Sequence, residues 1–172
     1  MFRQEYADFF IFAGLSEDQI RQLLPYMVEC QFKKDEVIFQ QGESADHLYV
    51  LLSGEILIRY KPYDGPPITV ARIEPGGVFG WSAALGRDTY TSAAIAMQDS
   101  LAYRLRGSNL PIICEQHPET GMILLDRLAG HGLALRLVTP KPLIETRAWD
   151  VDLVVIEKAT RNAVKFASFD WR

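Results

Sequence analysis

The chain has 172 residues, 48% of them hydrophobic and 23% charged, which is typical of one ordinary globular domain with a tail. Eighteen Lys and Arg stand against twenty-two Asp and Glu, and the net charge of −4 argues against direct DNA binding, which requires a basic surface. No apolar run approaches the roughly 20 residues of a membrane span and the N-terminus does not resemble a signal peptide, so the sequence predicts a cytoplasmic protein without membrane contact.

The first expected element is a helix over residues 17–27. Ser16 is a suitable N-cap, Gln19 completes a capping box, and apolar residues follow at helical spacing. Strand-like runs separated by glycines or turns come next. They cover residues 37–43, 46–56, 56–60, 68–73, 93–97 and 100–106. Many short strands with helices at both ends predict a mainly β, α+β fold, namely a jelly-roll-like double-stranded β-helix followed by a long C-terminal helix.

Two helices are expected after the strands, one over residues 109–116 with Ser108 as its cap and one over residues 119–138. The second helix has apolar and small residues at steps of three and four, the spacing of a helix-pairing seam. The seam residues are Leu125, Leu128, Gly132 and Leu135. The sequence therefore predicts a homodimer through this helix, and the alternative is a single helix that lies back on its own strands.

Residues 76–85 (GGVFGWSAAL) and 91–93 (TSA) resemble the phosphate-binding cassette of the cyclic-nucleotide-binding domain family, of the catabolite activator protein kind. The resemblance extends over roughly the first 135 residues. In that family a Glu accepts from the ribose hydroxyl and an Arg donates to the cyclic phosphate, while backbone N–H groups complete the anion site. Here Trp81 stands at the Glu position and Thr91 at the Arg position.

Both differences weaken the expected nucleotide site. An indole cannot replace a carboxylate as an acceptor, and a threonine supplies one neutral hydrogen bond where a guanidinium supplies a charged bidentate pair. Arg87 is the one cation inside the loop and could swing inward. The predicted ligand-binding residues of this degenerate cassette are Gly80, Trp81, Ser82, Ala83, Arg87, Thr91 and Ser92. Trp81 either fills an unused pocket or lines a pocket for a flatter, more apolar ligand.

Two functions follow from the resemblance. The first is a regulatory or sensory module in which a ligand in the roll pocket alters a partner or the dimer helix, with ordinary cyclic AMP binding weak or lost. The second is a ligand-free structural or protein-interaction module whose pocket is filled by Trp81. A cyclic nucleotide is thus a possible ligand and no other cofactor is expected, while a protein partner is possible in either case.

No enzyme is predicted, because the sequence has neither a nucleophile elbow nor a nucleotide-binding glycine loop. No metal site is predicted either, because His47, His117 and His131 are scattered. Residues 1–138 form the predicted domain, and residues 139–172 form an extension too short for a winged helix, so no DNA binding is expected. Residues 152–169 could form an amphipathic helix, or residues 151–156 a strand.

Overall fold

A computed structural model of the chain describes residues 6–138, with side chains described as far as residue 128. The predictions made for residues 139–172 lie outside this part. The helices are α1 (Glu17–Leu23), the 3-10 turn η2 (Leu24–Tyr26), α2 (Trp81–Ala84), α3 (Asn109–Gln116) and α4 (Pro118–Val138). The strands are β1 (Met27–Phe32), β2 (Val37–Phe39), β3 (His47–Ser53), β4 (Ile56–Tyr60), β5 (Ile68–Ile73), β6 (Val78–Phe79), β7 (Ala93–Ala96) and β8 (Ser100–Arg106).

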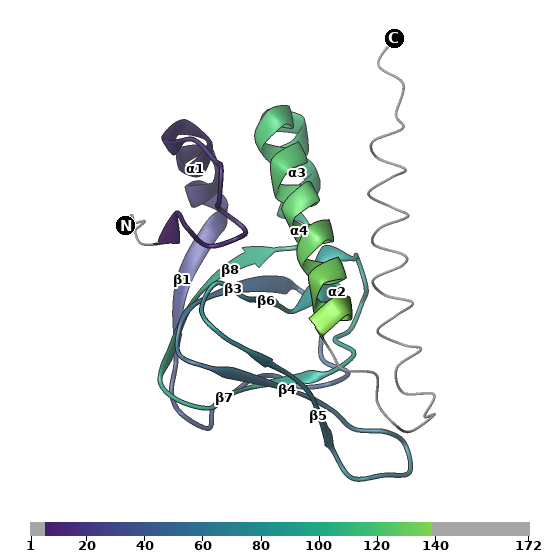
Figure 1. The fold of residues 1–172 in the computed structure, drawn as a ribbon. Coiled ribbons are helices and arrows are strands. Elements are labelled where there is room, and N and C mark those ends of the chain that lie inside the picture. The colour runs from purple at the N-terminus through teal and green to yellow at the C-terminus, as the bar shows by residue number, and fades with distance from the viewer. Residues whose placement is uncertain (1–5, 139–172) are drawn as a thin grey trace.

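The strands form two four-stranded antiparallel sheets. The helix-side sheet has the order β1-β8-β3-β6, and the outer sheet has the order β2-β7-β4-β5. Helices α1, α3 and α4 lie over the helix-side sheet, and the outer sheet closes the roll on the opposite side (Figure 1). The fold class is therefore the predicted one, a mainly β roll with flanking helices and a long helix after the last strand.

The helix-side sheet separates two hydrophobic clusters, because its strands are buried on both faces. Along β3 the side chains alternate between them, as the period of a strand requires. Leu48 and Val50 belong to the helix-side cluster, together with Leu110, Ile113 and other helix residues. Tyr49 and Leu51 belong to the roll cluster, between the two sheets. The roll cluster contains nine buried residues, namely Phe39, Tyr49, Leu51, Ile56, Ile73, Phe79, Tyr90, Ala94 and Ala96.

The capping box of α1 is confirmed, but the predicted end of the helix is wrong. Ser16 Oγ accepts the N–H of Gln19, and the Gln19 side chain accepts the N–H of Ser16. The α-helix ends at Leu23, because Pro25 has no N–H to continue the ladder and constrains the residue before it. Met27 begins β1, a strand that the sequence analysis assigned in part to the helix.

The bounds predicted for α3 are confirmed, whereas its predicted cap is wrong. Ser108 has helical φ and ψ, and its side chain makes no capping hydrogen bond. Helix α4 begins one residue earlier than predicted, at Pro118, where a fixed φ and a missing N–H are both tolerated. The Thr120 hydroxyl donates to Gln22 Oε1 over 2.6 Å, which ties α4 to α1.

Two of the predicted seam residues lie in the part whose side chains are described. Leu128 is buried in the chain's own helix-side cluster, while Leu125 is half-buried. Gly132 and Leu135 lie on α4, beyond the described side chains. The seam therefore stays a prediction, although Leu128 is already packed within its own chain.

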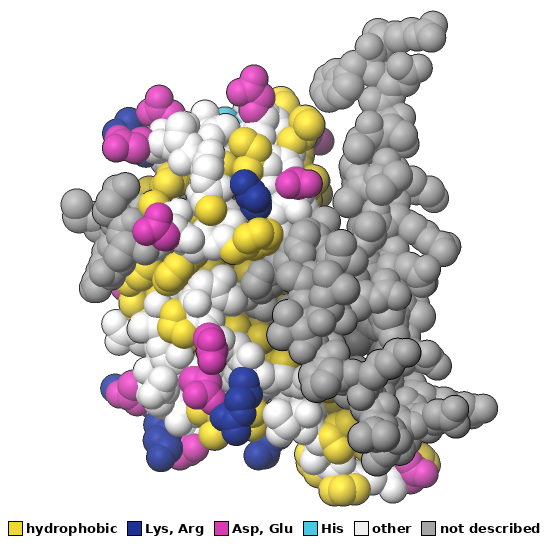
Figure 2. All heavy atoms as spheres, viewed as in Figure 1, with side chains coloured by type: hydrophobic (Ala, Val, Ile, Leu, Met, Phe, Trp, Pro, Cys, Tyr) yellow, Lys and Arg dark blue, Asp and Glu magenta, His cyan; other side chains and the backbone are white. Residues whose placement is uncertain are grey.

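The face of the molecule drawn in Figure 2 carries acidic and basic side chains intermixed over most of its described area. Apolar side chains gather on this face around the helices and at their junction with the sheet. Among the described helices, none has both the length and the apolar character needed to cross a membrane.

Candidate functional site

The cassette, residues 76–93, begins where β6 leaves the helix-side sheet. Gly80 follows β6 with a φ of +80° and forms the N-cap of α2. A Cβ at this position would lie 2.6 Å from the backbone oxygen of His47. Only glycine combines this φ with so close an approach to a neighbouring strand. The backbone therefore holds the start of α2 tightly against the start of β3.

The loop after α2 folds back onto that helix through Ser82. The N–H of Arg87 donates to the Ser82 carbonyl over 2.9 Å, and the N–H of Thr91 donates to the Ser82 hydroxyl over 3.4 Å. Ser82 itself is buried. These bonds bring Thr91 beside α2, so two predicted site residues meet although nine positions separate them.

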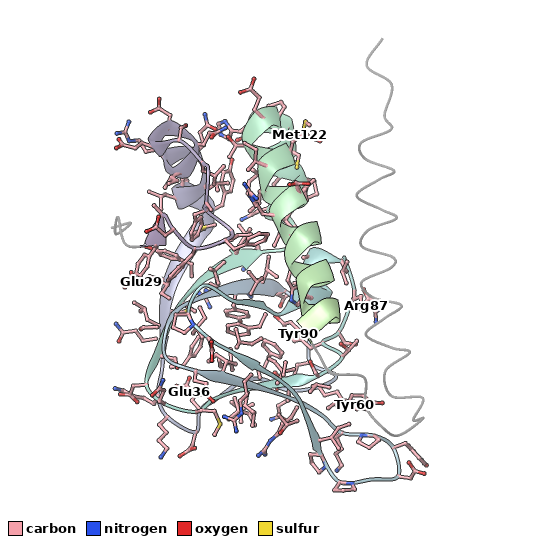
Figure 3. The ribbon with its side chains drawn as sticks, in the orientation of Figure 1. Glu29, Glu36, Tyr60, Arg87, Tyr90 and Met122 are labelled. Atoms are coloured by element: carbon pink, nitrogen blue, oxygen red, sulfur yellow. The ribbon has the colours of Figure 1, made fainter. Side chains whose placement is uncertain are left out.

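Tyr90 is the cassette side chain that enters the roll, and the sequence analysis did not select it. Its ring stacks on Phe39 with centroids 3.7 Å apart and an interplanar angle of 13°. Its hydroxyl donates to the His47 carbonyl over 2.7 Å and accepts the His47 N–H over 3.1 Å. Burial raises the pKa of Tyr90, so the phenol stays neutral. Figure 3 shows Tyr90 in the space between the two sheets.

Trp81 packs on the other side of the helix-side sheet. It is half-buried against the helix-side cluster, and its indole Nε1–H donates to the Val78 carbonyl over 3.2 Å. An indole has no acceptor for a sugar hydroxyl, so the position that holds the family's Glu carries apolar surface here.

Arg87 lies apart from the residues that meet around Ser82. Figure 3 places it at the outer edge of the roll, near the C-terminal end of α4, whereas Tyr90 lies inside. Its guanidinium makes no hydrogen bond or ion pair with any residue that the structure describes. Ala83 is buried on α2 and Ser92 is half-buried just before β7, so neither is freely exposed.

The described residues contain no group of three or more His, Cys, Asp and Glu side chains that could hold a metal ion. Cys30 and Cys114 are free thiols. Burial raises the pKa of Cys30 to about 11 and also raises that of Cys114, so both stay protonated and unreactive at neutral pH. Around the cassette, the described groups are therefore neutral hydroxyls, aromatic rings and backbone dipoles.

Similarity to known proteins agrees with this geometry. The chain is 25% identical over 157 residues to the cyclic AMP receptor protein of Thermus thermophilus, covering 91% of this chain and 67% of that protein. It is 30% identical over 98 residues to the cAMP-dependent protein kinase regulatory subunit of Dictyostelium discoideum, covering 57% of this chain and 30% of that protein. It spans about half of a CRP-like cAMP-activated regulator of Mycobacterium tuberculosis.

Solved structures show the same fold. A putative cyclic nucleotide-binding protein of Geobacter metallireducens superimposes with a TM-score of 0.66 at 28% identity, covering 79% of this chain and 99% of that one. A cyclic nucleotide-binding domain of Methylobacillus flagellatus gives 0.70 at 20% identity, covering 81% and 86%, and at that identity it supports the fold alone. The family model described as "Cyclic nucleotide-binding domain" matches residues 29–117, more than half of the chain. The chain belongs to the cyclic nucleotide-binding domain family.

Proposed function

We propose that this protein is a regulatory module in which an event at the cassette is passed through α3 and α4 to a partner or to a second copy of the chain. In this proposal it has no catalytic activity, acts in the cytoplasm and forms a homodimer. Its affinity for ordinary cyclic AMP is weak or lost.

The observation that carries the proposal is a cassette with the family's backbone and without its charged side chains. The left-handed Gly80, the short helix α2 and the Ser82 bonds supply a framework for backbone donors. Trp81 and Thr91 supply neither the carboxylate nor the guanidinium. Each hydrogen bond to a charged group contributes about 1.5–3 kcal/mol, so losing both sets costs about 100-fold or more in affinity.

Tyr90 favours a second candidate, a ligand-free interaction module. Its ring occupies the roll beside the cassette in close stacking with Phe39, and both of its hydroxyl bonds are made to backbone atoms of His47. A ligand that enters between the sheets would have to displace this ring. In this version of the alternative the roll is filled by Tyr90, and Trp81 covers the helix side.

Isothermal titration calorimetry with cyclic AMP and cyclic GMP tests the proposal directly. We expect no saturable heat up to about 1 mM nucleotide. Micromolar binding by the unaltered protein would contradict the loss of affinity and would show that backbone donors suffice. Tryptophan fluorescence measured in parallel reports on Trp81, which lies at the start of α2.

A gain-of-function variant separates the two candidates. Trp81→Glu with Thr91→Arg restores the missing charges and is expected to strengthen cyclic AMP affinity by about 100-fold. Trp81→Gln with Thr91→Gln is the matched control, because it changes the same positions without adding charge. If the charged variant folds but does not bind, Tyr90→Ala is added to empty the roll. Binding that appears only then supports the filled-roll alternative.

A further inference from the structure

Beyond the part covered by the outer sheet, the inner face of the helix-side sheet carries two arginines. Arg104 and Arg106 are two positions apart on β8 and therefore lie on the same face. Arg106 is opposite His47 on β3, and Arg104 is opposite Tyr49 on β3 and Val28 on β1. Opposed residues in an antiparallel pair have their Cβ atoms about 5 Å apart. We call Arg104, Arg106, His47 and Val28 the basic face.

The two arginines of the basic face are exposed and unpaired. Neither guanidinium makes a hydrogen bond or an ion pair with any described residue, whereas Arg21, Lys33 and Arg72 all pair with carboxylates. Burial, followed by the nearby Arg104 and Arg106, lowers the pKa of His47, against the weaker opposing effect of Asp46. The lowered pKa reflects a local positive potential on a chain whose net charge is −4.

Apolar surface and an open sheet edge lie next to this charge. Val28 is 51% exposed in the middle of β1, beside Arg104. β1 is the edge strand of the helix-side sheet, and in the described part of the chain its outer side pairs with no strand. An edge strand can accept an extended segment through backbone hydrogen bonds, and side chains of that segment then lie over the neighbouring strands.

The basic face is also braced against the cassette. Tyr90 bonds to both backbone groups of His47, and Gly80 approaches the His47 carbonyl too closely for any side chain. Gly107, directly after Arg106, leaves no room for a Cβ beside the Ala83 carbonyl of α2. The beginning of β3 and the end of β8 are therefore fixed to the cassette by direct contact.

We propose that the basic face and the adjoining edge of β1 are the docking site for an acidic, extended segment of a partner protein. Carboxylates of that segment pair with Arg104 and Arg106, and an apolar residue covers Val28. A strand face with an open edge suits a peptide segment, and the charge of the site is complementary to acid. The site lies outside the ligand pocket of the proposed function and requires no ligand in the cassette.

Fluorescence anisotropy tests the proposal with a capped, fluorescein-labelled ten-residue peptide in which Glu alternates with Val and Thr. The full chain is expected to bind this peptide saturably at low salt and to bind its Glu→Gln counterpart at least about tenfold more weakly. Arg104→Glu with Arg106→Glu is expected to weaken binding at least about tenfold. Amide shifts in β1 and β8 upon titration are expected to locate the peptide.

The matched control is Arg59→Glu with Lys61→Glu. Both residues are exposed on or just after β4 and unpaired among the described side chains, and this pair lowers the net charge of −4 to −8, as the test variant does. It is expected to leave peptide affinity within about twofold. Equal losses in the two variants, or no binding by the unaltered chain, would overturn the proposal. Circular dichroism melts show whether each variant is folded.

Two further outcomes would assign the basic face to another occupant and reject the acidic segment. The first is that ten-residue oligothymidylate binds more tightly than the peptide and is lost with the same arginines. The second is a dimer, seen by sedimentation, that the Arg104→Glu and Arg106→Glu variant alone dissociates.

Discussion

Gly80 and Gly42 have the same backbone requirement but different surroundings. Gly80 has a φ of +80° and Gly42 a φ of +89°, which side chains of L-residues rarely adopt. A Cβ at Gly42 would have no atom within 4 Å, whereas one at Gly80 would meet the His47 carbonyl. The two positions therefore separate backbone strain from crowding at the cassette.

We expect Gly42→Ala to lower the free energy of unfolding by about 1 kcal/mol, from backbone strain alone. Gly80→Ala adds a clash between a Cβ and a fixed strand, so its loss is expected to be about 1–3 kcal/mol larger. Urea unfolding followed by circular dichroism measures both. Similar losses at the two positions would mean that α2 moves away from β3 at little cost.

The same scale shows what the sequence could and could not say about the site. The glycine and hydroxyl pattern around Gly80 and Ser82 was sufficient to locate the cassette, because a short loop determines its own backbone. Tyr90 was missed because its role depends on Phe39 and His47, which are more than forty positions away. An aromatic residue between two threonines of an otherwise polar loop is the signal that could have identified it.

At the scale of elements, α4 has one face committed to the chain itself. Leu124 and Leu128 are buried in the helix-side cluster, while Met122 is 70% exposed and Leu125 half-buried (Figure 3). A dimer seam on this helix would therefore use the side that contains Met122 and Leu125, with Leu128 serving the monomer core.

We expect Leu125→Glu to shift a dimer to monomer while the fold is kept, because a charge at a helix seam opposes pairing. Leu128→Glu is expected to unfold the chain, because it buries a carboxylate without a partner. Sedimentation and thermal melts distinguish the two effects. A dimer that survives Leu125→Glu would exclude this side of α4 as its interface.

Elements with strong local signals were predictable, and elements set by tertiary pairing were not. The bounds of α3 follow from its apolar spacing and from the Pro118 that comes after it. β1 has a weakly alternating pattern and directly follows a helical signal, so only its pairing with β8 defines it as a strand. β6 is two residues long, too short for a period to show.

At the scale of the whole molecule, the groups buried near the roll share one direction of pKa change. Burial raises the pKa of Cys30 from 9.0 to about 11, and it raises those of Tyr49 and Tyr90 above their ordinary value of 10.0. The neutral forms of these groups are favoured in the folded state. Their contribution to stability is complete below the pKa of the unfolded thiol and is lost as pH rises through the folded values.

We therefore expect the free energy of unfolding to fall between pH 9 and pH 11 and beyond. The share of Cys30 is about 1–2 kcal/mol, because water partly screens the half-buried thiol. Urea unfolding at a series of alkaline pH values measures the fall, and Cys30→Ala is expected to reduce it. A profile that is unchanged by this substitution would show that the tyrosines alone account for the alkaline loss.

The alternation of β3 between two separate cores limits how the length of this chain can change. A one-residue insertion or deletion within His47–Ser53 would exchange the side chains of the helix-side and roll clusters beyond the insertion point. The loop between β4 and β5, residues 61–67, meets no such requirement. Natural variation in length should therefore accumulate in that loop, while β3 keeps a constant number of residues even where its side chains are replaced.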